Sequence, residues 1–461
     1  MQNKTMENEK LKVDNSPSSS LSLSKCEGVG CETARGSANL KTNSHSVLTS
    51  AMLSTSDTES PKNVPKIRFK GCNSTYKRYK FSDIFLFSTG KNIKQNEASP
   101  EFKTPCIRYG ELYHMYSEVV TKVINRTDLE TDDLLFSYGD EILLPSAGED
   151  PLDIGSASAL MLKNIAIGRT INILRPAQKN TYSQIYVSYY INNKLRKNIS
   201  KLARGSSISN VYNSDLKKLK INLPTLPEQQ KIADCLSTWD ESIENAKLII
   251  ENKKLYKKGM MQKIFSQEIR FKDDTSTPLS ASGADYPDWV ESRVRDLFEI
   301  TRGHVLPVTK ISDKKTDIYK YPVYSSQTKR NGLTGFFDTY LYENSITWTT
   351  DGANAGDVNL RKGKFYCTNV CGVLISENGY ANECLAQILN SISHKHVSYI
   401  GNPKLMNNTM GEIKITIPRK LQEQTKIANF LSAIDDEIEI LESQLAELEL
   451  QKKGLMQGMF V

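Results

Sequence analysis

Two 38-residue segments of the chain share one spacing of apolar residues, which recur alternately three and four positions apart. The segments begin at Glu228 and Glu423, and at a constant offset of 195 residues 17 of their 38 positions are identical. A seven-residue repeat with two apolar positions is typical of helices that pack along a common seam. Prolines precede both segments, as is usual before a helix. We therefore predict long helices over residues 226–268 and 419–461.

The apolar positions also predict which side chains form this seam. In the first segment they are Ile232, Leu236, Trp239 and Ile243; in the second they are Ile427, Leu431, Ile434, Ile438, Leu441, Leu445 and Leu448. Such a helix is roughly 57 Å long, more than one globular unit needs, so we expect the two to pair as a coiled coil. Charge favours the antiparallel pairing, because the basic stretch 253–258 then meets the acidic stretch 435–437.

Outside these helices the pattern changes to short β-rich runs between polar turns, and it does so twice. The motif IRFK stands at 67–70 and again at 269–272, and strand-like runs close each copy before a proline, KINLP at 220–224 and KITIP at 414–418. The line FSDIFLFSTGK from Phe81 resembles VRDLFEITRGH from Val294. Internal repeats of this kind indicate two copies of one structural unit.

We therefore predict an α/β fold with two tandem globular domains, over 67–225 and 269–418, each followed by one long helix. In the second domain SITWTT at 345–350 is typical of a strand. The stretches YPVYSSQT at 321–328 and DGANAG at 351–356 are interpreted as polar loops between strands.

The first 66 residues differ in composition from the rest. Residues 1–60 contain 13 serines and no Phe, Trp or Tyr, too little apolar surface to offset the entropy of ordering, so we predict a disordered tail over 1–66. An internal start of translation near Met52 is the alternative. The N-terminus lacks the apolar core of a secretion signal and no apolar run is long enough to span a bilayer, so we expect a cytoplasmic protein without membrane contact.

Charge narrows the choice of partner. The net charge is +7, but the N-terminal 66 residues and the two helical segments together carry −3, which leaves +10 on the globular stretches. Lysine and arginine that neutralise phosphates release condensed counterions, so a basic balance favours DNA as partner. An ordinary basic surface is the alternative.

Catalytic motifs are missing from the sequence. Neither GKS nor GKT occurs, as an ATP-binding P-loop would require, and no Pro-Pro dipeptide is present for an adenine methyltransferase loop. Pro287-Asp288 and Glu412-Ile413-Lys414 offer the letters of a Mg²⁺ nuclease but are 124 residues apart. Cys367 and Cys371 with His394 and His396 have poor spacing for zinc. We predict no catalytic residue, no metal site and no cofactor bound by this chain.

Side chains that read DNA are polar or basic and lie on loops or helix ends. On that ground the DNA-binding candidates are Lys91, Arg108, Tyr109, Arg204, Ser206 and Ser207 in the first domain, and Arg302, His304, Ser325, Gln327, Thr328, Lys329, Asn331 and Lys404 in the second. For each of them the alternative is a solvated loop residue without a contact.

The repeated set KINLP, PEQQKIA and KKGMMQ, matched by KITIP, EQTKIA and KKGLMQ, resembles the paired conserved regions of the specificity subunits of type I restriction-modification systems. The resemblance covers about 67–461. It implies a non-catalytic subunit in which each domain reads one half of a bipartite, asymmetric DNA target and the helices fix their separation. It also implies partners: two modification subunits that methylate adenine with S-adenosylmethionine, and restriction subunits that use ATP and Mg.

Two other function classes remain open from the sequence. A stand-alone nuclease would cut DNA with Mg²⁺ as a purified chain. A structural coiled-coil adaptor would bind DNA, if at all, without regard to its sequence. A specificity subunit that has lost its modification partner is a related possibility.

Overall fold

The computed structural model describes residues 53–55, 64–272, 286–326 and 329–461. The tail predicted over 1–66 therefore lies mostly outside the described residues. Within it, β1 (Leu53–Thr55) is an antiparallel strand paired with β2 (Ile67–Phe69), where the sequence predicted no order. The backbone groups of β1 form hydrogen bonds with the edge strand β2. Side-chain composition does not predict a strand pairing of this kind.

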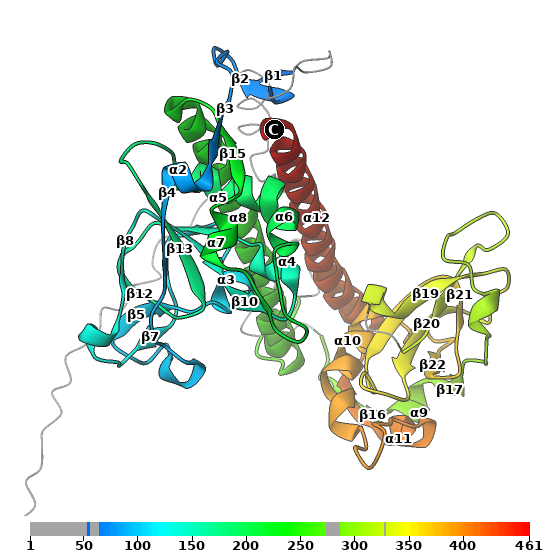
Figure 1. Ribbon diagram of the computed structural model, residues 1–461. Coiled ribbons are helices and arrows are strands. Elements are labelled where there is room, and N and C mark those ends of the chain that lie inside the picture. The colour runs from blue at the N-terminus through cyan, green and yellow to red at the C-terminus, as the bar shows by residue number, and fades with distance from the viewer. Residues whose placement is uncertain (1–52, 56–63, 273–285, 327–328) are drawn as a thin grey trace, which may run out of the picture. The chain divides into compact units, whose positions relative to one another are not determined.

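The two long helices are α8 (Leu226–Phe265) and α12 (Leu421–Met459). They pack against each other and run antiparallel (Figure 1). Lys257 Nζ lies 2.7 Å from Asp435 Oδ1, and Lys253 pairs with Glu437. The predicted meeting of the basic and acidic stretches is thereby confirmed.

The seam residues divide between two kinds of environment. All are buried apart from the half-buried Leu445. Ile232 and Leu236 belong to the core of the first domain, together with Phe460 from the end of α12. Leu431 belongs to the core of the second domain, together with Ile264 from the end of α8. Each domain core therefore takes one end of each helix, and only the middle of the seam is helix against helix.

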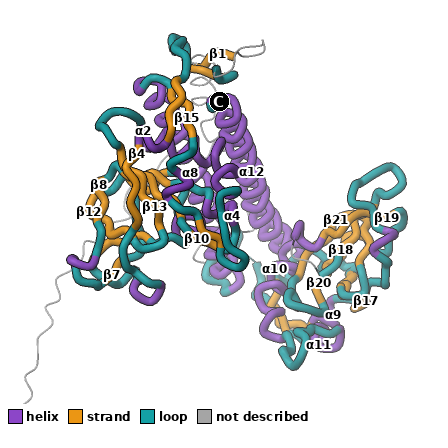
Figure 2. The backbone as a smooth tube through the Cα atoms, viewed as in Figure 1, coloured by secondary structure: helices purple, strands orange, loops and turns teal. Residues whose placement is uncertain are grey.

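The first domain contains two larger sheets, and Figure 2 shows its strands in orange. The five-stranded sheet has the order β4 (Phe85–Thr89), β13 (Ile171–Pro176), β9 (Glu141–Pro145), β11 (Ser158–Leu160), β6 (Val119–Val120). The four-stranded sheet has the order β7 (Arg126–Thr127), β5 (Thr104–Ile107), β12 (Lys163–Ile167), β8 (Phe136–Tyr138). Short pairs join β3 (Lys77–Lys80) to β15 (Lys220–Leu223) and β10 (Ala147–Gly148) to β14 (Ser209–Asn210). The helices are α2 (Phe81–Ile84), α3 (Glu111–His114), α4 (Pro151–Ile154), α5 (Gln184–Tyr190), α6 (Arg196–Ser200) and α7 (Asn213–Leu216), and a π-helical turn over Ile191–Leu195 joins α5 to α6. Because α5 contacts α8, it links the sheets to the long helix.

The second domain has one sheet of six strands in place of the two larger sheets of the first. Their order is β17 (Glu299–Arg302), β22 (Cys371–Ile375), β20 (Tyr342–Thr349), β21 (Val358–Cys367), β18 (Tyr321–Tyr324), β19 (Leu333–Phe337). The remaining elements are the paired strands β16 (Val290–Arg293) and β23 (Lys414–Ile417) and the helices α9 (Val294–Leu297), α10 (Glu383–Ile392) and α11 (Asn407–Glu412). The prediction of tandem α/β domains is confirmed.

One local prediction is wrong, and the two copies of one repeated motif differ in structure. YPVY at 321–324 is the strand β18 and not a loop, because Val323 points into the core and the aromatic residues beside it suit a pleated strand. The second IRFK copy, 269–272, is not a strand like the first and contains a single bridged residue, Arg270. SITWT at 345–349 lies within β20, which ends one residue before Thr350, and DGANAG is a loop, as predicted.

Among the helices that the structure describes, not one is both long and apolar enough to cross a bilayer.

Candidate nucleic-acid interface

Three loops meet at one edge of the sheet of the second domain. Residues 367–370, which comprise the last residue of β21 and the turn before β22, hold them by backbone hydrogen bonds. The N–H of His304 donates to Cys367 O (3.1 Å). The N–H of Thr350 donates to Val370 O (2.9 Å), and the N–H of Thr368 donates to Tyr324 O (2.9 Å). The ends of β17, β20 and β18 are thus gathered, and with them the candidates Arg302, His304 and Ser325.

The first domain has the same frame of hydrogen bonds. The N–H of Lys91 donates to Ile167 O (3.0 Å), and the N–H of Ser146 donates to Thr170 O (2.8 Å). The N–H of Gly168 donates to Ile107 O (2.9 Å). Lys91 therefore occupies the place of His304, and Arg108 occupies the place of Ser325. The two edges share a backbone arrangement but carry different side chains.

One glycine in each domain makes this frame possible. A Cβ atom on Gly90 would lie 1.9 Å from Gly168 O, and one on Gly303 would lie 2.3 Å from Cys367 O. No residue with a side chain fits where the strand end passes so close to the turn. This accounts for the glycine that both repeated sequence lines carry before their candidate residue, in STGK and TRGH.

Carboxylates and backbone carbonyls hold several basic candidates in place. Arg302 NH2 lies 2.9 Å from Asp351 Oδ2, and Arg204 NH2 lies 3.0 Å from Asp215 Oδ2. Arg108 Nε donates to Glu111 Oε1 (2.9 Å), and Lys91 Nζ donates to Asp132 O (2.9 Å). A guanidinium has five N–H donors, so these contacts fix its position and leave donors for a ligand.

The remaining candidates differ in how accessible they are. Tyr109, Ser206, Ser207, His304, Asn331 and Lys404 are exposed. Ser325 is half-buried and accepts a hydrogen bond from Thr368 Oγ1 (2.9 Å). Gln327, Thr328 and the side chain of Lys329 lie outside the described residues. The structure brings Lys404 next to Arg302, because Lys404 forms a β-bridge with Asp351.

A polar hollow of about 250 Å³ beside Ser325 and Asn331 contains a residue that the sequence analysis missed. Arg361 lines it, buried on β21, with its guanidinium 3.8 Å from the centroid of the Tyr324 ring. Its Nε donates to Thr347 Oγ1 (3.0 Å), and burial lowers the pKa of its guanidinium. An arginine within a strand-forming run was the available signal, but only the fold shows that it faces inward.

Two buried ion pairs attach the domains to the long helices. Arg68 NH2 lies 2.7 Å from Glu228 Oε2 at the start of α8, and Arg270 NH2 lies 2.9 Å from Glu423 Oε2 at the start of α12. The repeated IRFK and EQ motifs therefore bind each other, a contact that the sequence analysis did not identify. We call these pairs the arginine–glutamate clamps.

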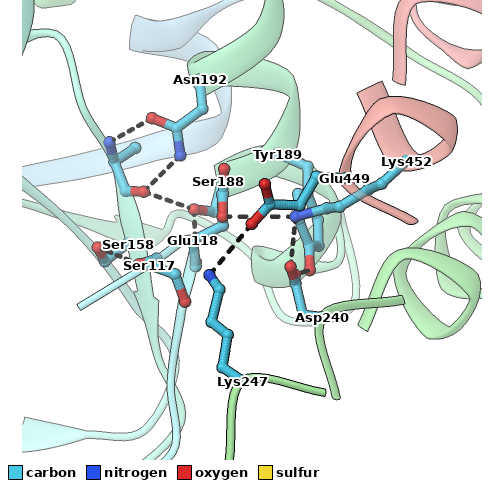
Figure 3. A network of polar contacts seen from close by, with 11 residues as sticks. Ser117, Glu118, Ser158, Ser188, Tyr189, Asn192, Asp240, Lys247, Glu449 and Lys452 are labelled. Atoms are coloured by element: carbon cyan, nitrogen blue, oxygen red, sulfur yellow. Dashed lines mark hydrogen bonds and ion pairs between the residues drawn. The ribbon is translucent and has the colours of Figure 1, made fainter. Parts of the chain in front are cut away.

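A polar network ties the first domain to both helices (Figure 3). Lys452 of α12 pairs with Asp240 of α8, and its Nζ lies 3.9 Å from Glu118 Oε2. Tyr189 of α5 donates to the same Asp240, and burial together with this carboxylate raises the pKa of Tyr189 far above its usual value. At the repeat offset the matching pair is Lys257 with Asp435.

The residues that match the nuclease motif, Asp288, Glu412 and Lys414, do not come together as a site. Glu412 pairs with Arg293 and Arg295, and Lys414 pairs with Glu291. Arg293 lies opposite Lys414 and Val290 opposite Ile417, so Asp288 lies beyond the far end of this ladder. Within the described ranges no three His, Cys, Asp or Glu side chains come together to hold a metal. Cys367 and Cys371 belong to an apolar cluster.

Comparison with known proteins agrees with this arrangement. A family model described as the type I restriction modification DNA specificity domain matches residues 73–252 and 286–450. A type I specificity subunit of Mycoplasma pneumoniae is 35% identical over 168 residues, which are 35% of this chain and 54% of that protein, so the match spans about half of the relative. A type I restriction enzyme specificity subunit of Methanocaldococcus jannaschii is 29% identical over 306 residues, 63% of this chain and 70% of that one. The crystal structure of a type I system S subunit from M. genitalium has the same fold, with a TM-score of 0.59 at 20% identity over 86% of this chain and 99% of that chain.

Proposed function

The chain belongs to the type I restriction-modification DNA specificity family, and from that premise we propose that it is the non-catalytic subunit that reads a bipartite DNA target. In this proposal the first domain reads one half-site and the second domain reads the other. The lysine and arginine candidates bind phosphates and so position the domains, while polar side chains on the loops contact base edges.

The observation that carries the proposal is the repeated sheet edge. Both domains present a loop surface on the same backbone frame, yet Lys91 stands where the second domain has His304, and Arg108 stands where it has Ser325. Equal frames with different side chains would bind DNA in the same way and read different bases. The target would therefore have two unlike halves.

The helix pair supports the second part of the proposal, a fixed distance between the half-sites. The cores that take opposite ends of α8 and α12 belong to different domains, so the pair lies between them. Two modification subunits would bind this chain and methylate adenine with S-adenosylmethionine, and restriction subunits would use ATP and Mg. These partners come from the family, and the cytoplasm remains the compartment we expect.

Single-molecule sequencing of adenine methylation tests the proposal in cells that carry the chain with its modification partner and in cells deleted for the chain. We expect methylation at one split motif to vanish on deletion, which would also give the target sequence. Unchanged methylation would contradict the proposal. DNA binding by the purified chain that ignores sequence would favour an adaptor instead.

A further inference from the structure

Each domain carries one short hairpin of the same construction beside its candidate interface. In the first domain the N–H of Arg204 donates to Asn210 O (3.0 Å) and the N–H of Asn210 donates to Arg204 O (2.8 Å). In the second domain Ser398 and Lys404 exchange the equivalent bonds at 2.8 and 2.9 Å. Each pair of bonds closes a five-residue tip, GSSIS or YIGNP. We call them the tip hairpins.

Both tip hairpins are fixed to the shared frame at the same point. The residue after the first, Val211, donates its N–H to Ser146 O (2.9 Å), and the residue after the second, Leu405, donates its N–H to Thr350 O (2.9 Å). Ser146 and Thr350 are the equivalent residues that also bind the central turns. The tips therefore extend from the edge at which the candidate residues gather.

The tips expose isoleucine where a turn usually carries polar residues. Ile400 is 94% exposed and its neighbour Tyr399 is 69% exposed, while Ile208 in the first domain is 57% exposed. Exposed apolar side chains are common singly, but two equivalent hairpins of unrelated sequence both have one. Each hairpin has one basic closing residue, Arg204 or Lys404, and Arg204 is also paired with Asp215.

Each tip hairpin combines an apolar tip with a basic closing residue. From this combination we infer that each tip hairpin inserts its isoleucine between two stacked base pairs of its half-site. The inference rests on the proposed function and adds a distortion of the duplex to it. Proteins that insert isoleucine or leucine in this way unstack a base step and bend the duplex by roughly 20–90°. Specificity then includes how readily the target step unstacks, in addition to contacts with base edges. The basic closing residues Arg204 and Lys404 would bind the flanking phosphates while the isoleucine enters the base stack.

Fluorescence of 2-aminopurine, which rises when a base loses its stacking neighbours, tests the inference. The full chain is bound, together with its modification subunits, to duplexes that contain the mapped motif. Each duplex carries the probe at one position, which is never the methylated adenine. S-adenosylmethionine is left out of the reaction. We compare the natural chain with Ile400→Ala and Ile208→Ala. Ile440→Ala is the matched control, because Ile440 is 57% exposed on α12 and away from the sheet edges.

We expect a rise at one step in each half-site. Ile400→Ala should abolish the rise in one half-site, Ile208→Ala should abolish it in the other, and the control should keep both. Binding to the motif without any rise would overturn the inference and leave the proposed function intact. So would an Ile400→Ala variant that loses affinity only at a thymine, because that result indicates contact with a methyl group in the major groove. A chain that does not distinguish the motif from a scrambled duplex would overturn both proposals.

Discussion

At the residue scale, the arginine–glutamate clamps add a buried ion pair to the apolar contact between each domain and its helix. The side chains of Arg270 and Glu423 are 11% and 1% exposed, so removing one partner leaves a buried charge uncompensated. We predict that Arg270→Met lowers the free energy of unfolding by about 3–5 kcal/mol, measured by urea denaturation.

An exposed pair provides the control for this change. Lys414 and Glu291 also form an ion pair, but their side chains are 58% and 61% exposed, so Lys414→Met should cost less than about 1 kcal/mol. Similar losses for the two variants would contradict the role we give to burial.

Buried thiols make the stability of the protein sensitive to alkaline pH. Burial raises the pKa of the Cys371 thiol from 9.0 to about 11 and that of Cys106 from 9.0 to about 12. As the pH rises, these thiols lose their protons in the unfolded chain before they do so in the folded chain. Their contribution to the free energy of unfolding is therefore fully present below pH 9 and decreases above it.

We predict a free energy of unfolding that falls from about pH 9 upward, by at most about 1.4 kcal/mol per pH unit for each thiol. Denaturant titrations at pH 8, 9, 10 and 11 would measure it. Cys371→Ala should reduce the slope between pH 9 and 11, and an unchanged slope would show that this thiol does not contribute.

At the same scale the candidate residues show how far sequence reasoning reaches. Residue type and turn composition identified Arg302, His304 and Lys404, and the fold brings these three together. Arg361 was missed because its significance depends on the ring of Tyr324 across the sheet, and no local pattern encodes that contact. Whether any of them touches DNA remains a prediction.

At the scale of elements, periodicity was a good guide to helices and a weaker one to short strands. The long helices end within three residues of the predicted bounds, because each has some forty residues over which the apolar repeat accumulates. The strand β18 has only four residues and was interpreted as a loop, since so short a run does not separate strand from turn.

Pairing across the helices gives a prediction of its own. Lys257 is 17% exposed on its side chain and meets Asp435, so Lys257→Asp places two carboxylates together and should lower the free energy of unfolding. The double variant Lys257→Asp with Asp435→Lys should recover about 0.5–1 kcal/mol of that loss. A double-mutant cycle in urea measures the coupling. A double variant no more stable than Lys257→Asp alone would show that the pair is not coupled.

At the scale of the whole molecule, the repeat predicted two domains on two helices, but not how they are joined. The clamps connect residues more than 150 positions apart in the sequence, beyond the reach of any local signal. The antiparallel direction followed from charge alone, because only that direction sets lysines against carboxylates.

The helix pair predicts the spacing of the target. One heptad added to α8 beside Lys247 and one to α12 beside Glu449, which face each other, keeps the apolar seam in register. Seven residues of helix add about 10.5 Å, and at about 3.4 Å per base pair the two half-sites should move apart by about 3 base pairs. Methylation sequencing reads the new spacer directly.

A heptad added to α8 alone is the control for this change, because it shifts the two seams out of register. That variant should unfold at lower urea concentration and lose methylation. An unchanged spacer in the double insertion would contradict the role of the helices in setting the distance.

The clamps also bear on how such a protein changes over generations. Each clamp consists of an arginine and a glutamate at the start of a long helix, and both halves of the chain contain this pair. Both domains are therefore attached to their helices by the same contact. An exchange between two genes within the helix repeat would join the first domain of one parent to the second domain of the other, with both clamps kept; on the proposed function, each domain would bring its own half-site. The number of possible targets would then grow as the product of the available halves, and a population could acquire a new target in one step.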